Sequence, residues 1–201
     1  NMGFVKASKE GKKYEKIAAK INDYLDFMDA VGVNTSTVID LNTVEFFTSH
    51  EGLHLPYESA LTRVDSLTNE VYCTSAHFIW IGDRTRFIDS AHVEFCRGIS
   101  NPIGIKCGPS LDPDELVKII ETINPTNEAG KISLIFRYGE ENIDKHLPAL
   151  VEAVTKNNKN VLWISDPMHG NTVKSSSGLK TRDFNSLLNE TSKAIKILKE
   201  K

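Results

Sequence analysis

Five short apolar runs, each ending in polar or charged residues, recur along the chain with helical patterns between them. The runs occupy residues 44–51, 77–84, 102–106, 132–137 and 160–166. Near-continuous apolar runs of this length are typical of strands that are buried on both faces of a parallel sheet. Their alternation with helices therefore predicts an α/β fold in which helical crossovers connect parallel strands.

The segments between the runs carry helix signals. Asp112 is a candidate N-cap and Pro113 fits the first helical position, and the apolar residues that follow fall on one face. Similar apolar stripes begin at Leu147 and at Phe184, and residues 14–28 predict an opening helix.

Two architectures accommodate this alternation, a doubly wound sheet and a (β/α)8 barrel. A barrel usually needs about 250 residues, so five strands would form only part of one. We expect a single domain over residues 1–201, with a leading helix and connection in 1–43 and βα units in 44–201.

The charge balance and the cysteines exclude several classes of protein. The chain has 24 Lys plus Arg against 27 Asp plus Glu, which argues against bulk electrostatic binding to nucleic acid. Its apolar runs are too short to cross a bilayer. Its 3 cysteines are too scattered for a disulfide framework, which favours a reducing compartment. We therefore expect a cytoplasmic protein without nucleic-acid or membrane partners.

Charged side chains follow the predicted strands at the ends where ligands bind in parallel α/β folds. They are Asp83, Arg84, Arg86, Lys106, Arg137 and His169, with Lys180 and Arg182 in the loop before the last helix. Several cations meeting there would bind phosphates or carboxylates. The alternative is that each is simply solvated or paired within a loop. Lys106 and Arg137 favour a site, because each directly ends an apolar run.

Other residues at these ends have two interpretations each. His169 precedes Gly170, and it either serves the site as a ligand or catalytic residue or is a structural hydrogen-bonding group. His50 and Glu51 end the first run and could face the pocket. Trp80 is either a core residue or part of the pocket wall. The chain has no GxGxxG, GxxxxGK[ST], GxSxG or HExxH motif. The residues alone indicate a parallel α/β enzyme or binding domain for a small anion, with one candidate metal ligand.

Five longer stretches carry a family resemblance. They are residues 48–53 (TSHEGL), 75–86 (SAHFIWIGDRTR), 101–109 (NPIGIKCGP), 166–172 (DPMHGNT) and 175–182 (SSSGLKTR). In this order they resemble type II 3-deoxy-D-arabino-heptulosonate 7-phosphate (DAHP) synthase. The resemblance covers nearly the whole chain.

The resemblance implies a (β/α)8 barrel of which this chain supplies about strands 3 to 7. It implies a transferase that condenses phosphoenolpyruvate with erythrose 4-phosphate in the first step of the shikimate pathway. A divalent metal, Mn²⁺ or Co²⁺, would assist, and the intact enzyme would be a homo-oligomer. We expect the family's other metal ligands, a Cys, a Glu and an Asp, to lie outside this sequence.

The resemblance also implies roles for individual residues. The phosphate and carboxylate of phosphoenolpyruvate would be held by three cations: Arg84, Lys106 and Arg137. Lys106 could also carry a proton, and His169 would bind the catalytic metal. Asp83 stands where the family usually has Glu, and Lys180 would contact the aldose phosphate.

Glu51 and Trp80 would line the pocket, whereas Arg86 and Arg182 lie within motifs without an implied role. Two further hypotheses differ from this function. One is a non-catalytic, truncated relative that binds a phosphorylated anion or a partner chain. The second is a different phosphate-handling barrel enzyme.

Overall fold

The computed structural model describes residues 11–34, 36–38 and 46–200. The chain divides into two compact units, Asn1–Phe46 and Phe47–Lys201. In the first unit, α2 (Gly11–Ala30) confirms the predicted opening helix. Its apolar residues, among them Ile17 and Leu25, are exposed.

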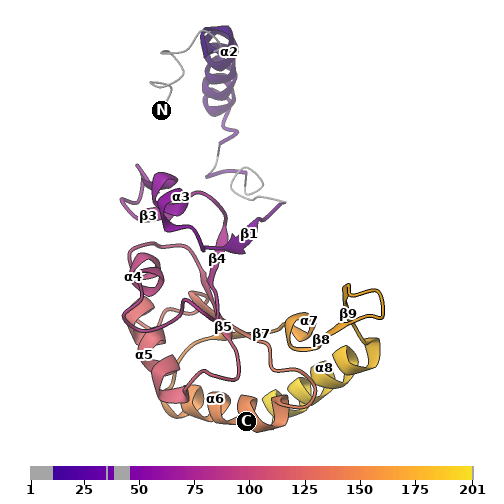
Figure 1. The fold of residues 1–201 in the computed structure, drawn as a ribbon. Helices are drawn as coiled ribbons and strands as arrows, with labels where there is room; N and C mark the ends of the chain where they lie inside the picture. The colour runs from indigo at the N-terminus through magenta and orange to yellow at the C-terminus, as the bar shows by residue number, and fades with distance from the viewer. Residues whose placement is uncertain (1–10, 35, 39–45, 201) are drawn as a thin grey trace. The chain divides into compact units, whose positions relative to one another are not determined.

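The second unit contains a parallel sheet of five strands (Figure 1). The strands are β1 (Ser49–Glu51), β4 (Phe78–Ile81), β5 (Ile103–Cys107), β6 (Ile132–Phe136) and β7 (Leu162–Ser165). They lie in the order β1-β4-β5-β6-β7, and every pairing is parallel. The five predicted strands are therefore confirmed, although residues 44 and 45 of the first run lie outside the described residues.

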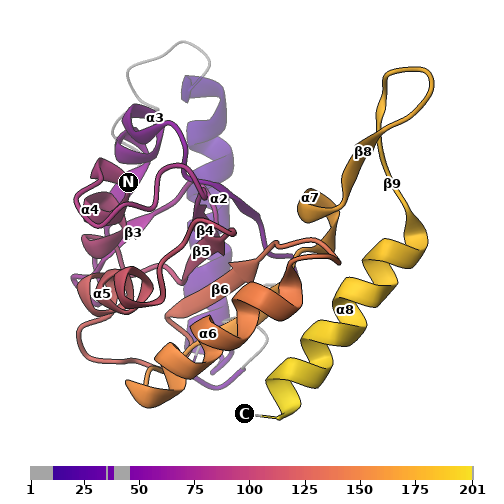
Figure 2. The same ribbon diagram turned by 60° about the horizontal axis from the view of Figure 1, so that its bottom comes forward.

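Helices follow the strands in the predicted alternation. They are α4 (Ala91–Arg97), α5 (Pro113–Ile123), α6 (Ile143–Lys156) and α8 (Phe184–Lys199). Asp112 is the N-cap of α5, because its side chain accepts hydrogen bonds from the backbone N–H groups of Asp114 and Glu115, at 3.0 Å each. Figures 1 and 2 show α4, α5 and α6 succeeding one another along the outer side of the strands.

The core lies between the sheet and these helices. Ile103 and Leu134 from the sheet are 0% exposed, as are Leu116 of α5 and Leu147 of α6. Strands buried in this way need apolar residues at successive positions, which explains the continuous apolar runs. Within the described residues the sheet is open, with β1 and β7 at its edges. The arrangement is that of a mixed α/β domain with a parallel sheet, and it is consistent with part of a barrel.

Several short elements were not predicted. They are α3 (Leu55–Ala60), the antiparallel pair β2 (Thr62–Val64) and β3 (Val71–Cys73), α7 (Pro167–Gly170), and the antiparallel pair β8 (Thr172–Lys174) and β9 (Lys180–Arg182). In both ribbon views the β8–β9 hairpin projects away from the sheet (Figures 1 and 2).

The predicted apolar stripe of α8 is only partly buried. Phe184 is 72% exposed and Leu188 is 52% exposed, whereas Glu190 and Ala194 are buried. Glu190 reaches the loop that follows β6, so the inward side of the helix carries a carboxylate. No helix in the described part of the chain is long and apolar enough to cross a membrane.

Candidate active site

A hollow of about 550 Å³ lies at the carboxyl ends of the parallel strands. It is lined by Glu51, Trp80, Gly82, Asp83, Arg84, Lys106, Arg137 and His169. The structure therefore brings together every residue for which the resemblance implied a role except Lys180, whereas the candidates Arg86, Arg182 and His50 do not line the hollow. We call this hollow the basic pocket, because three of its side chains are Arg or Lys.

Strand register explains why residues far apart in sequence meet here. Glu51 pairs with Trp80, and Trp80 pairs with Gly104 on the next strand. A side chain at Gly104 would collide with the Trp80 side chain, since a Cβ there would lie 2.7 Å from Trp80 Cβ. Lys106 Nζ lies 5.8 Å from the centre of the Trp80 ring, within the range of a cation–π interaction. Trp80 thus walls the pocket, which is one of the two roles expected for it.

Asp83 is a junction of hydrogen bonds behind the pocket. Its Oδ1 accepts from the backbone N–H of Gly108 and from Arg86 Nε, both at 3.0 Å, and its Oδ2 accepts from Arg137 Nη1 at 3.3 Å. Arg86 itself is 1% exposed and also reaches Glu115 at 3.6 Å. In this structure Asp83 orients Arg137, and Arg86 holds Asp83.

Arg137 retains an unused donor. Its Nε is shielded from solvent and has no hydrogen-bond partner among the described residues. Buried polar groups are nearly always hydrogen-bonded, so this donor is an exception among the side chains of the site.

Asp166 is a site residue that the sequence analysis did not single out. Its carboxylate forms an ion pair with Lys106 Nζ and accepts from His169 Nδ1 at 2.7 Å. Burial raises the pKa of Asp166, but the hydrogen bonds from Lys106 and His169 outweigh burial and hold that pKa below its usual value. The signal was available, because Asp166 ends the fifth predicted run.

His169 has the orientation of a metal-binding histidine. A carboxylate on Nδ1 fixes the imidazole, and within the described residues Nε2 has no hydrogen-bond partner. The described part of the chain nevertheless contains no group of three or more His, Cys, Asp or Glu that could hold a metal ion. His169 fits as one ligand, and these residues alone do not complete a metal site.

Lys180 and Arg182 lie on the β8–β9 hairpin and are not among the residues that line the basic pocket. Lys180 is exposed and pairs in register with Lys174. Arg182 Nε donates to the backbone carbonyl of Met168 at 3.0 Å, which ties the hairpin to α7.

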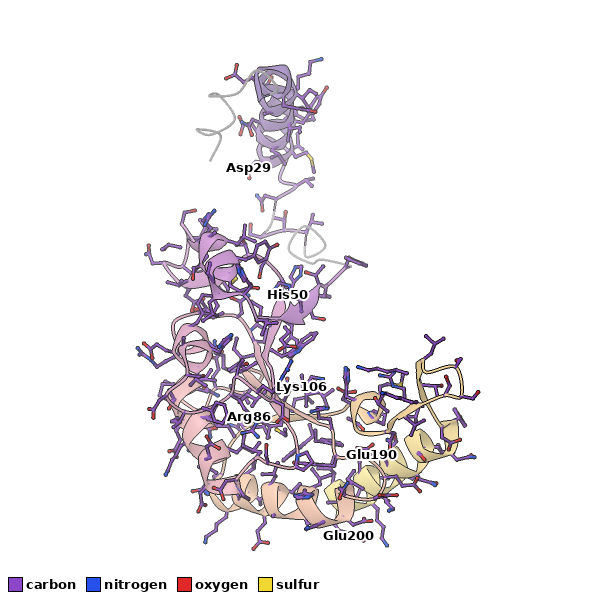
Figure 3. The ribbon with its side chains drawn as sticks, in the orientation of Figure 1. Asp29, His50, Arg86, Lys106, Glu190 and Glu200 are labelled. Carbon is purple, nitrogen blue, oxygen red and sulfur yellow. The ribbon has the colours of Figure 1, made fainter. Side chains whose placement is uncertain are left out.

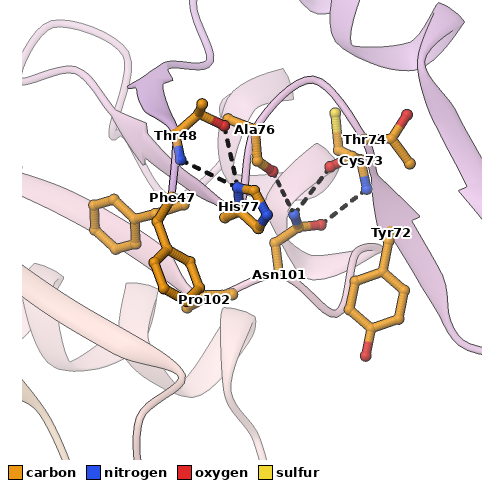
Figure 4. A pocket seen from close by; sticks show the side chains of 10 residues that line it. Phe47, Thr48, Tyr72, Cys73, Thr74, Ala76, His77, Asn101 and Pro102 are labelled. Atoms are coloured by element: carbon orange, nitrogen blue, oxygen red, sulfur yellow. Dashed lines mark hydrogen bonds between the residues drawn. The ribbon is translucent and has the colours of Figure 1, made fainter. Parts of the chain in front are cut away.

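A larger hollow of about 690 Å³ lies at the opposite, amino ends of the strands (Figure 4). Phe47 and Phe78 contribute to a largely apolar lining, and its lining residues include no Lys or Arg. Asn101 braces it with a hydrogen bond from the backbone N–H of Cys73 at 2.8 Å. Ligands of parallel βα folds bind at the carboxyl ends, so the basic pocket is the candidate active site.

Comparison with known proteins decides the family. The model of the class-II DAHP synthetase family matches residues 1–201. The chain belongs to this family. The family match confirms the resemblance that the five sequence stretches indicated.

Three curated relatives of this chain are named as phospho-2-dehydro-3-deoxyheptonate aldolases, the first of them as a probable one. A probable phospho-2-dehydro-3-deoxyheptonate aldolase, chloroplastic, of Catharanthus roseus is 50% identical over 94% of this chain and 38% of its own length. A phospho-2-dehydro-3-deoxyheptonate aldolase of Streptomyces coelicolor is 50% identical over 94% of this chain and 42% of its own. The phospho-2-dehydro-3-deoxyheptonate aldolase of Neurospora crassa is 44% identical over 99% of this chain and 44% of its own length. The chain thus spans roughly two-fifths of the length of these relatives.

Proposed function

We propose that the protein carrying this sequence is a DAHP synthase, a transferase that condenses phosphoenolpyruvate with erythrose 4-phosphate. The observation that carries the proposal is the cluster of Arg84, Lys106 and Arg137 in the basic pocket. Phosphoenolpyruvate offers a phosphate and a carboxylate to such donors. The names of the three relatives support the same activity.

The reaction explains the need for clustered cations. C3 of phosphoenolpyruvate attacks the aldehyde carbon, a C–C bond forms, and positive charge develops at C2. Water then adds at C2 and inorganic phosphate leaves. Two phosphorylated substrates repel each other, so Arg and Lys both neutralise and orient them. Lys106, which forms an ion pair with Asp166, would carry a proton at this site.

The metal belongs to the proposal as well. His169 would supply one ligand to Mn²⁺ or Co²⁺, and further ligands would come from outside the described residues. Such a metal, when bound, provides Lewis-acid polarisation of the aldehyde oxygen. Lys180 on the hairpin would contact the phosphate of the aldose, and Glu51 and Trp80 would line the pocket beside it.

The proposal also covers the closure of the barrel, the oligomeric state and the cellular location. The five-stranded sheet would form part of a closed (β/α)8 barrel, in which the edge strands β1 and β7 would each pair with another strand of the barrel. The intact enzyme would be a homo-oligomer. It would act in the cytoplasm, although the relative from Catharanthus roseus is named chloroplastic.

A second candidate function is that of a non-catalytic relative that binds a phosphorylated anion or a partner chain. Two observations on the described residues favour it: the sheet has open edges, and no group of three or more His, Cys, Asp or Glu could hold a metal ion. Open strand edges invite pairing with another chain, and one imidazole does not build a catalytic metal site.

Phosphate release distinguishes the two functions. In the intact protein with Mn²⁺, we expect release that requires both substrates, and at least about a 100-fold loss in Lys106→Met. Lys118→Met removes an exposed lysine from α5 and serves as the matched control, with release close to the unsubstituted level. Phosphoenolpyruvate binding without any phosphate release would favour the non-catalytic function.

A further inference from the structure

Glu190 is a carboxylate with no exposure to solvent. It lies on α8 and is 0% exposed. None of the ion pairs recorded for the described residues involves it, so hydrogen bonds take the place of a counter-charge. Burying a carboxylate in this way is costly unless its oxygens are fully used, which makes its partners informative.

The two oxygens of Glu190 bind two different loops. Oε1 accepts from the backbone N–H groups of Tyr138 and Gly139, at 3.2 and 3.0 Å, in the loop after β6. Oε2 accepts from Asn171 Nδ2 at 2.5 Å, in the segment after α7. Glu190, which is labelled in Figure 3, therefore joins the loops that follow two neighbouring strands.

Asn171 extends this junction. Its Nδ2 also donates to the carbonyl of Pro167 at 2.8 Å, and its Oδ1 accepts from the backbone N–H of Glu140 at 3.0 Å. These partners fix the direction of the amide, because a carboxylate and a carbonyl accept on one side and an N–H donates on the other. The side chain thus needs a donor and an acceptor at defined positions.

The two loops touch through their backbones at the same place. Gly139 has φ +83° and a Cβ on it would lie 2.8 Å from the carbonyl oxygen of Gly170. A Cβ on Gly170 would lie 2.3 Å from Gly139 N. Arg137 lies two positions before Gly139 and His169 directly before Gly170, so the contact sits behind two residues of the basic pocket.

We propose that Glu190 is a positioning residue that sets the spacing of Arg137 and His169 by locking the loops after β6 and β7 together. The inference deepens the proposed function and rests on it for the choice of phosphoenolpyruvate as probe. Partners one layer behind a binding group commonly change its affinity by 10-fold or more when removed, about the effect expected here.

A swap of donors and acceptors tests the role. Glu190→Gln places an amide N–H₂ opposite another donor, and Asn171→Asp places two carboxylates together. Each single substitution should weaken phosphoenolpyruvate binding about 10-fold. The double variant restores a donor facing an acceptor between positions 190 and 171, but a carboxylate oxygen then faces the Pro167 carbonyl where an N–H donated before. It should recover part of the affinity that the single variants lose.

The measurements are the dissociation constant of phosphoenolpyruvate by calorimetry, in buffer with Mn²⁺, and the thermal midpoint of the same samples. Asn189→Ala is the matched control. It removes an exposed hydrogen bond of 2.7 Å from the neighbouring residue of α8 to Glu140, without touching Gly139 or Asn171. Its affinity for phosphoenolpyruvate should stay within about twofold of the unsubstituted protein.

Recovery of affinity in the double variant supports the inference. A lowered thermal midpoint with unchanged affinity in the single variants would show a purely structural role and overturn it, as would a double variant no better than the singles. Binding without turnover in the unsubstituted protein contradicts the proposed function alone, since the comparison of affinities still stands. Absence of any phosphoenolpyruvate binding would overturn both.

Discussion

Glu58, on α3, is buried with 2% exposure and is bound by three side chains. Ser75 Oγ donates to its Oε2 at 2.5 Å, Cys73 Sγ donates at 3.3 Å, and His50 Nε2 lies 2.8 Å from Oε1. Burial raises the pKa of Glu58, but these hydrogen bonds outweigh burial and hold the pKa below 4.5. The ionised carboxylate is therefore the form that stabilises this corner of the fold.

Glu58→Gln should lower the free energy of unfolding by about 1–3 kcal/mol at neutral pH, because it leaves buried donors without a full acceptor. A folded pKa below the unfolded value gives stabilisation that is complete above pH 4.5 and is lost as pH falls through the folded pKa. The stability difference should therefore shrink below pH 4.5 in urea denaturation. Exposed Glu152→Gln is the control. A difference that stays constant with pH would contradict the assignment.

Arg86→Met should destabilise the protein by about 3–5 kcal/mol, because it removes one partner of a buried ion pair. Arg86 is 1% exposed, and its loss leaves Asp83 without its 3.0 Å contact. Chemical denaturation measures the change. Arg97→Met, which removes an exposed arginine paired with Glu94, should change stability little. Equal stability of the two variants would show that the buried pair contributes nothing.

The rule that strand ends converge accounts for most of the candidate site. It predicted that Asp83, Lys106 and Arg137 would meet, and the same rule would have found Asp166. Glu190 could not be found in this way, because its partners are backbone N–H groups of a loop about fifty residues earlier in the sequence. A buried carboxylate on a helix produces no recognisable pattern in the nearby sequence when the N–H groups that donate to it come from a distant segment.

At the scale of elements, the segments ending in Gly139 and Gly170 are in close backbone-to-backbone contact. Gly170→Ala would place a methyl group 2.3 Å from Gly139 N, so the two segments must separate. We expect a loss of about 1–3 kcal/mol in stability and weaker binding of phosphoenolpyruvate. Denaturation and calorimetry on one sample measure both.

Gly98→Ala is the matched control for that change. Gly98 has φ −87°, and a Cβ added to it would lie 3.5 Å from the carbonyl oxygen of Phe95, which is an ordinary van der Waals contact. The control should be as stable as the unsubstituted protein or slightly more so, because alanine restricts the unfolded chain. Similar losses in both variants would mean that the contact between the two segments is not tight.

Long apolar runs predicted elements well, and short mixed ones did not. The runs that became β5 and β6 are buried along almost their whole length, so sequence and structure agree. The strands β2, β3, β8 and β9 have three residues each, too few to show alternation. Lys180 was therefore expected in a loop at the pocket, whereas it lies on a projecting hairpin.

For the whole molecule, the burial of the central strands predicts the order of hydrogen exchange. Each of β5 and β6 is paired on both sides and packed under helices, so their amides should exchange slowest in mass spectrometry. The edge strand β1 and the β8–β9 hairpin, which are largely exposed, should exchange early. Slow exchange in the hairpin with fast exchange in β6 would contradict this order.

The sheet order β4-β5-β6-β7 follows the order of the chain, with each strand beside the one that precedes it. On a ribosome, a completed strand and helix would already present an edge to the next strand as it emerges. Every closure then spans only one βα unit, so the entropic cost of each step is nearly the same. Such a sheet can grow by addition at one end, in step with translation.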